Sequence, residues 1–169
     1  MSKSQQQLLL PNLLKFYKDP KNIRILDEFI NHEKTEQPIT LTNSQTSKLN
    51  PKFKSKLTIG LLDWFTTDYA IKNNVQYYLN QDGEILTDIP PGTISFKYVN
   101  VSSSYNTALS AYKKPLFDPF ARGKNKQGQI KIKISKNKTI VTNIRQLNYF
   151  RWAIENGVIT YIKQNINNL

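Results

Sequence analysis

The residues of this sequence with the clearest chemistry are positive charges that crowd between residues 113 and 138. Asp118 is the one acid in this segment. The bases are Lys113, Lys114, Arg122, Lys124, Lys126, Lys131, Lys133, Lys136 and Lys138. Concentrated positive charge attracts polyanions whatever the fold beneath it, and phosphate groups bind lysine and arginine side chains. The segment therefore predicts nucleic acid as the partner.

Within this segment, residues 129–134 alternate between apolar and basic side chains. In a strand, Lys131 and Lys133 project from one face about 7 Å apart, and the isoleucines between them project from the other. That interval resembles the phosphate repeat of a nucleic-acid strand. The same pattern also suits an ordinary solvated face, or an edge strand that lysines protect from pairing with other chains.

A second candidate contact lies in the helix that we expect to begin near residue 143. Arg145 shares one side of this helix with Tyr149 and Trp152, at about 100° per residue. An arginine beside aromatic side chains can hold phosphates and stack bases, as it does in single-strand binders. The opposing interpretation is that both aromatic side chains lie in the core, because large aromatic residues are mostly buried.

Candidates for catalysis and metal binding are few. The chain has no cysteine and a single histidine, His32, which excludes thiolate chemistry and multi-histidine metal sites. Asp118 has no acid near it in sequence, and we expect it to cap a turn or to pair with Arg122. A metal-dependent nuclease would need Asp63, Asp88 and Asp118 to meet in the fold, and no spacing motif indicates that they do.

The charge balance of the whole chain favours a binding protein over an enzyme. The net charge is +12, and residues 101–169 carry twelve Lys or Arg against two acids, whereas residues 1–100 are nearly balanced. Abundant Lys, Asn and Ile indicate an AT-rich genome, which explains part of the lysine excess but not its uneven distribution. The six glycines form no phosphate-binding loop. We therefore expect a non-enzymatic protein without a cofactor or a metal.

The N-terminal part of the sequence reads as helices and a linker. Apolar spacing predicts two short helices within residues 8–32 and an amphipathic helix over about residues 57–73. The segment between them, residues 33–56, is polar and rich in Thr, Ser, Gln and Lys. We expect an N-terminal helical hairpin arm over 1–32, a polar linker over 33–56 and an α+β domain over 57–169.

The rest of the chain predicts the sheet and its covering helices. Strand periodicity over 75–101, with a hairpin signal at Asp82-Gly83, is followed by a helix that begins near Ser103 or Ser104. The strand over 129–134 is expected to pair with residues 139–141. Thr142 or Asn143 is expected to cap a helix that ends at residues 156–157, and a last helix spans 158–165. The predicted fold class is α+β, a single domain with one antiparallel sheet of about four to five strands packed by helices.

Nothing in the sequence suits a membrane. The apolar run at residues 8–10 is stopped by Pro11, far short of a spanning helix or an export signal. We therefore expect a soluble, intracellular protein that makes no membrane contact. The apolar residues within 8–30 form a possible surface for a homo-oligomer or a protein partner.

Three strings in the chain resemble a protein family of nucleocytoplasmic large DNA viruses, the giant viruses, to which no chemistry is assigned. The strings lie at residues 62–65, at 105–109 continuing to 117–120, and at 146–156, and the resemblance covers about residues 57–163. The family has a denser arginine cluster after residue 120, where this chain has Ala121-Arg122-Gly123-Lys124. The resemblance implies a setting in the virion or in a cytoplasmic viral factory, and a role with genomic DNA.

Together these observations predict a non-enzymatic protein that binds nucleic acid largely independently of its sequence. The alternative is a structural or scaffold protein of the virion or viral factory, which would act through protein–protein contacts. A nuclease-like hydrolase is the third hypothesis. The sequence does not distinguish DNA from RNA as the ligand.

Overall fold

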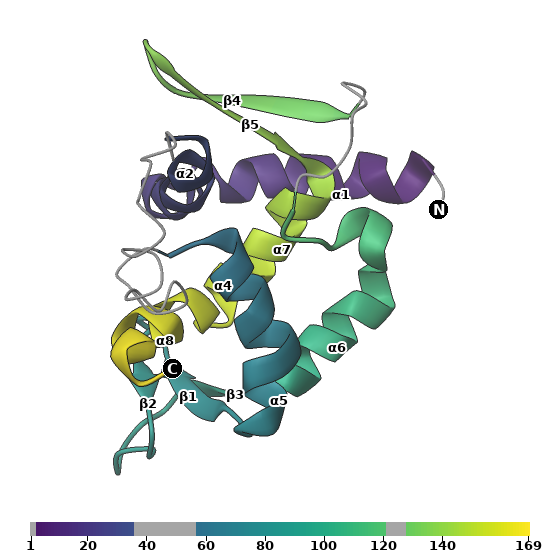
Figure 1. The fold of residues 1–169 in the computed structure, drawn as a ribbon. Coiled ribbons are helices and arrows are strands. Elements are labelled where there is room, and N and C mark those ends of the chain that lie inside the picture. Colours follow the sequence, from purple (N-terminus) through teal and green to yellow (C-terminus); the bar gives the residue numbers. More distant parts are fainter. Residues whose placement is uncertain (1–2, 36–56, 121–127) are drawn as a thin grey trace.

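Figure 1 shows a computed structural model of the chain, which describes residues 3–35, 57–120 and 128–169. Side chains in the first of these ranges are described for residues 5–30. The described parts contain helices and two small antiparallel sheets, one of three strands and one of two. The predicted α+β class is confirmed.

Helix α7 (Ile144–Glu155) lies at the centre of the core, and most of its side chains are buried. It begins where predicted, because the Asn143 side chain accepts a hydrogen bond from a backbone N–H three residues further on (3.0 Å). Gly157 follows its end with a φ of 69°, the left-handed conformation that favours glycine. The next helix, α8 (Val158–Asn165), has the predicted bounds, and a short 3₁₀ turn, η3 (Ile166–Asn168), comes after it.

The predicted N-terminal helical hairpin is confirmed and consists of α1 (Lys3–Phe16) and α2 (Pro20–Thr35). The two helices separate at the Asp19-Pro20 break. The Asp19 carboxylate there accepts a hydrogen bond from the backbone N–H of Lys21 (2.9 Å). A side-chain oxygen in this position satisfies one of the N–H groups that the first turn of a helix leaves without a partner.

This hairpin is packed into the body of the protein rather than set apart as an arm. Leu13, Leu26 and Phe29 are buried in the same core as α7. The buried Tyr17 hydroxyl donates a hydrogen bond to the backbone carbonyl of Leu147 in α7 (2.6 Å). The apolar stripes that predicted the two helices therefore find their cover on the C-terminal part of the chain.

The helix predicted for residues 57–73 is present as three consecutive segments. They are α4 (Ile59–Trp64), a π-helical turn η1 (Phe65–Tyr69) and α5 (Ala70–Lys72). The buried Thr66 hydroxyl contacts the Tyr149 hydroxyl of α7 within the π turn (2.8 Å). This bond places the widened turn directly against the central helix.

The first sheet has the strand order β2-β1-β3, with β1 (Gln76–Asn80) between β2 (Ile85–Leu86) and β3 (Phe96–Asn100). The predicted hairpin turn joins β1 to β2. One face of the sheet packs on α8, where Tyr77 stacks on Tyr161 with ring centroids 5.2 Å apart. The opposite face is not covered by any described element of the chain.

Helix α6 (Val101–Tyr112) continues directly from β3, and a 3₁₀ turn, η2 (Lys114–Leu116), follows it. The predicted N-cap at Ser103 or Ser104 is wrong by a few residues. Asn100 is the cap, because its side chain accepts a hydrogen bond from the backbone N–H of Ser103 (3.1 Å). A serine also suits this role, so local sequence alone does not choose between adjacent caps.

The second sheet is the hairpin of β4 (Gln129–Ser135) and β5 (Lys138–Asn143). The expectation of one sheet of four to five strands is corrected here, because the five described strands divide into two separate sheets. In Figure 1 the hairpin lies over α1 and α2, on the side of the molecule opposite the first sheet. Its apolar face finds cover on helices and not on a third strand.

Candidate nucleic-acid interface

The outer face of the β4–β5 hairpin carries Lys131 and Lys133, the two lysines that the sequence predicted to project from one face of the strand. Lys131 and Lys133 are exposed, whereas Ile130, Ile132 and Ile134 are partly buried against the core. The predicted alternation of the strand is therefore confirmed. The lysines pair in register with Val141 and Thr139 of β5, so the outer face of this sheet contains no acid.

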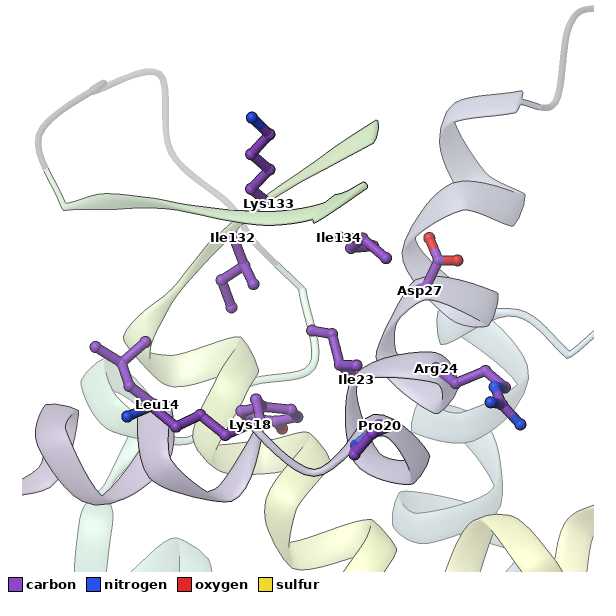
Figure 2. A pocket seen from close by; sticks show the side chains of 10 residues that line it. Leu14, Lys18, Pro20, Ile23, Arg24, Asp27, Ile132, Lys133 and Ile134 are labelled. Carbon is purple, nitrogen blue, oxygen red and sulfur yellow. The ribbon is translucent and has the colours of Figure 1, made fainter. Parts of the chain in front are cut away.

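The inner face of the hairpin rests on the N-terminal helices across a cavity of about 580 Å³. Figure 2 shows Ile132 and Ile134 pointing from β4 toward Ile23 of α2, while Lys133 points away from the helices. Lys18, Arg24 and Asp27 also line the cavity. The helical hairpin thus supports the sheet from below and leaves the lysines toward solvent.

Lys136 and Lys138 differ in their surroundings although they are two residues apart. Lys136 is exposed at the turn between β4 and β5. The Lys138 ammonium lies 2.9 Å from a carboxylate oxygen of Asp27 in α2. An exposed pair of this kind contributes about 0–1 kcal/mol, so the contact with Asp27 competes only weakly with a phosphate for Lys138.

Lys113 and Lys114 lie at the end of α6 and are both exposed. Lys113 has a positive φ of 60°, which ends the helix and turns the chain into η2. The Leu116 carbonyl in η2 accepts a hydrogen bond from the buried Asn148 side chain of α7 (2.8 Å). The core therefore fixes the backbone that carries these two lysines.

Three predicted contacts, Arg122, Lys124 and Lys126, lie outside the described residues. They belong to the segment that joins residue 120 to the hairpin. Their part in the interface stays a prediction.

The aromatic half of the second candidate contact is buried. Trp152 is 8% exposed and donates a hydrogen bond from Nε1 to the Ser104 hydroxyl (2.9 Å). Tyr149 is fully buried, so the interpretation that places both aromatic side chains in the core is confirmed. Neither ring offers a face to a base. Arg145 is half-buried, and its backbone carbonyl accepts a hydrogen bond from the Asp118 N–H (3.4 Å).

Asp118 occupies the turn position that the sequence predicted for it. Its carboxylate accepts a hydrogen bond from the backbone N–H of Phe120 (2.9 Å), which closes the turn locally. Burial raises the pKa of Tyr105, and the negative charges of Asp63 and Asp118 raise it further. Two carboxylates therefore face this tyrosine, but no group of three or more potential metal ligands forms among the described residues.

The sequence interpretation missed the aromatic cluster of the first sheet, which consists of the exposed Phe96 and Tyr98 and the half-buried Tyr78. Strand alternation does put Phe96 and Tyr98 on one face of β3. It does not say which face is covered, because Val99 on the other face is apolar as well. Within the described residues, no helix is long and apolar enough to cross a membrane.

Comparison with known proteins identifies relatives of the chain, but these relatives have no assigned chemistry. Residues 46–169 match a family described as "Family of unknown function (DUF7197)". An Acanthamoeba polyphaga mimivirus protein, "Uncharacterized protein L507", is 34% identical over 145 residues, which are 85% of this chain and 50% of that protein. The chain thus spans about half the length of the curated relative that it matches. No solved structure shows significant similarity. The predicted resemblance to an uncharacterised family of giant viruses is confirmed.

Proposed function

The chain belongs to this family of unknown function, DUF7197, and from that premise we propose that it is a non-enzymatic nucleic-acid-binding protein of a large DNA virus. Binding is largely independent of sequence and serves DNA packaging in the virion or work in the cytoplasmic viral factory. One observation carries the proposal: Lys131 and Lys133 project side by side from a sheet face that holds no acid and that points away from the core.

The chemistry of this face is electrostatic. Lysine ammonium groups that contact phosphates release the counterions condensed on the nucleic acid, and this release drives association. Lys136 at the hairpin turn extends the positive face beyond the strand pair. With no exposed aromatic side chain on this face to read or stack bases, the contacts fix the phosphate backbone and carry no sequence information.

The decisive experiment compares two double variants that lose the same charge. Lys131→Gln with Lys133→Gln removes the aligned pair, whereas Lys15→Gln with Lys72→Gln removes two exposed lysines from α1 and α5. Fluorescence anisotropy with labelled double-stranded DNA and single-stranded RNA is measured from 50 to 300 mM salt. Each lost phosphate contact lowers the salt slope by about 0.9, so the hairpin variant should bind DNA roughly 30-fold more weakly at 0.15 M salt.

The control variant should stay within about threefold of the unsubstituted protein, because only general attraction is reduced. Equal losses in the two variants would place binding elsewhere on the basic surface. Binding that is absent, or that does not depend on salt, would refute the proposal.

The alternative function, a scaffold protein, was first expected to use the apolar residues within 8–30 for protein–protein contact, but another surface supports it better. Most apolar residues within 8–30 are used in the core, although Leu8 and Leu14 stay exposed. The uncovered aromatic face of the first sheet is a better candidate for protein–protein contact, because exposed apolar patches mark interaction sites.

A further inference from the structure

The uncovered face of the first sheet carries an aromatic cluster formed by Tyr78, Phe96 and Tyr98. The Tyr78 ring centroid lies 5.7 Å from that of Phe96 and 5.5 Å from that of Tyr98. Phe96 is 45% exposed, Tyr98 is 51% exposed, and Ile94 just before the strand is 98% exposed. Side chains of this size gain stability from burial, so their joint exposure indicates a surface that a partner covers.

The charge around the aromatic cluster is opposite to that of the rest of the chain. Residues 73–96 contain Asp82, Glu84 and Asp88 but no Lys or Arg, in a protein of net charge +12. Lys97 lies on the other face of β3, where its ammonium group donates a hydrogen bond to the Asn156 side chain (2.8 Å). All three acids are exposed. Carboxylates at these positions repel phosphates, so this face does not suit a nucleic acid and suits a basic partner.

The chain itself provides a surface with the complementary charge. Lys131 and Lys133 stand on the outer face of the β4–β5 hairpin, with no acid on that face. Figure 1 places the hairpin and the first sheet on opposite sides of the molecule. The two surfaces cannot meet within one copy, but they can meet between two.

We propose that, where nucleic acid does not occupy its lysines, the hairpin of one copy docks on the aromatic face of the first sheet of another copy, giving head-to-tail assembly. The lysine ammonium groups then lie over the rings of Tyr78, Phe96 and Tyr98, where cation–π attraction is favourable. The loops on either side of β2 carry Asp82, Glu84 and Asp88, whose negative charge attracts the docked lysines. Such a contact joins two different surfaces, so it builds rings or open chains rather than closed dimers.

The proposal makes a test possible in which two blocked variants complement each other. Lys131→Glu with Lys133→Glu disables the hairpin but keeps the sheet. Phe96→Ser with Tyr98→Ser disables the sheet but keeps the hairpin. The substituted side chains are exposed, so both variants should keep the unsubstituted fold, which circular dichroism checks.

Sedimentation velocity of the full chain, without nucleic acid, is measured at 50 and 500 mM salt up to about 100 µM protein. The unsubstituted protein should form species larger than a dimer at low salt and dissociate at high salt. Each blocked variant alone should be monomeric. An equimolar mixture should form a 1:1 dimer and nothing larger, because only one intact hairpin and one intact sheet remain.

A matched control, Leu8→Ser, removes an exposed apolar side chain from α1 and should leave assembly unchanged. A monomeric unsubstituted protein at low salt, or a mixture that fails to form the dimer, would overturn the proposal. So would loss of nucleic-acid binding by Phe96→Ser with Tyr98→Ser, since that result would make the sheet a nucleic-acid surface. If the protein is monomeric yet binds DNA in a salt-dependent way, the assembly proposal fails and the nucleic-acid function stands.

Discussion

At the scale of single residues, Gly157 is the described glycine with the least room for a side chain. Its φ of 69° suits glycine, and an added Cβ would lie 2.6 Å from the Leu79 side chain of β1. Gly157→Ala is therefore expected to lower the free energy of unfolding by about 2–3 kcal/mol, of which about 1 kcal/mol is backbone strain. Urea unfolding followed by circular dichroism measures the difference.

Gly83 provides the matched control for this prediction. It also has a positive φ, of 78°, but a Cβ there would meet nothing within 4 Å. Gly83→Ala should therefore cost only the backbone part, about 1 kcal/mol. If the two variants are equally stable, the close contact with Leu79 contributes nothing and the packing of α8 against the sheet is looser than described.

At the scale of elements, the N-terminal helical hairpin is expected to behave as part of the core. Leu13 is fully buried, whereas its neighbour Leu14 is 39% exposed. Leu13→Ala should lower the free energy of unfolding by about 2–5 kcal/mol, because it leaves a cavity between α1 and the rest of the core. Leu14→Ala should change it by less than about 1 kcal/mol. Thermal or urea unfolding of both variants distinguishes a packed hairpin from a loosely attached one, for which the two losses would be similar and small.

The individual elements also show which structural features could be predicted from local sequence and which could not. The bounds of α7 and α8 were predictable, because Asn143 and Gly157 act on their own helix ends. The division into two sheets was not, since strand periodicity names neither the partner of a strand nor its covered face. For the same reason, the sequence did not predict that Phe96 and Tyr98 are exposed. The burial of Trp152 likewise depends on how α7 packs in the fold. The lysine face of β4 was predictable because its other face is purely apolar.

At the scale of the whole molecule, buried tyrosines make stability sensitive to high pH. Burial is the largest cause that raises the pKa of Tyr17, Tyr77 and Tyr149 above the usual value of 10.0. The unfolded chain then releases these protons first as the pH rises. Their contribution to stability is complete below pH 10 and is lost progressively above it, by up to about 1.4 kcal/mol per pH unit for each tyrosine.

Urea unfolding between pH 9 and pH 11 at constant ionic strength tests this expectation. The free energy of unfolding should fall with increasing slope above pH 10. Tyr149→Phe should be less stable at pH 8 by about 1 kcal/mol, because it loses the bond to Thr66. Its slope above pH 10 should be shallower, because one buried titrating group is gone. An unchanged slope would mean that the Tyr149 proton is not retained in the folded protein.

The hydrogen bond from Tyr17 to Leu147 joins residues that are 130 positions apart in the chain. During synthesis on the ribosome, α1 and α2 emerge long before residues 144–155 exist to cover them. The apolar faces of the first two helices therefore stay without their final partner until α7 is made. The core can pack only after most of the described chain has been translated. We expect such a nascent chain to depend on chaperones or on slow elongation. A chain whose early segments pack on each other would depend on them less.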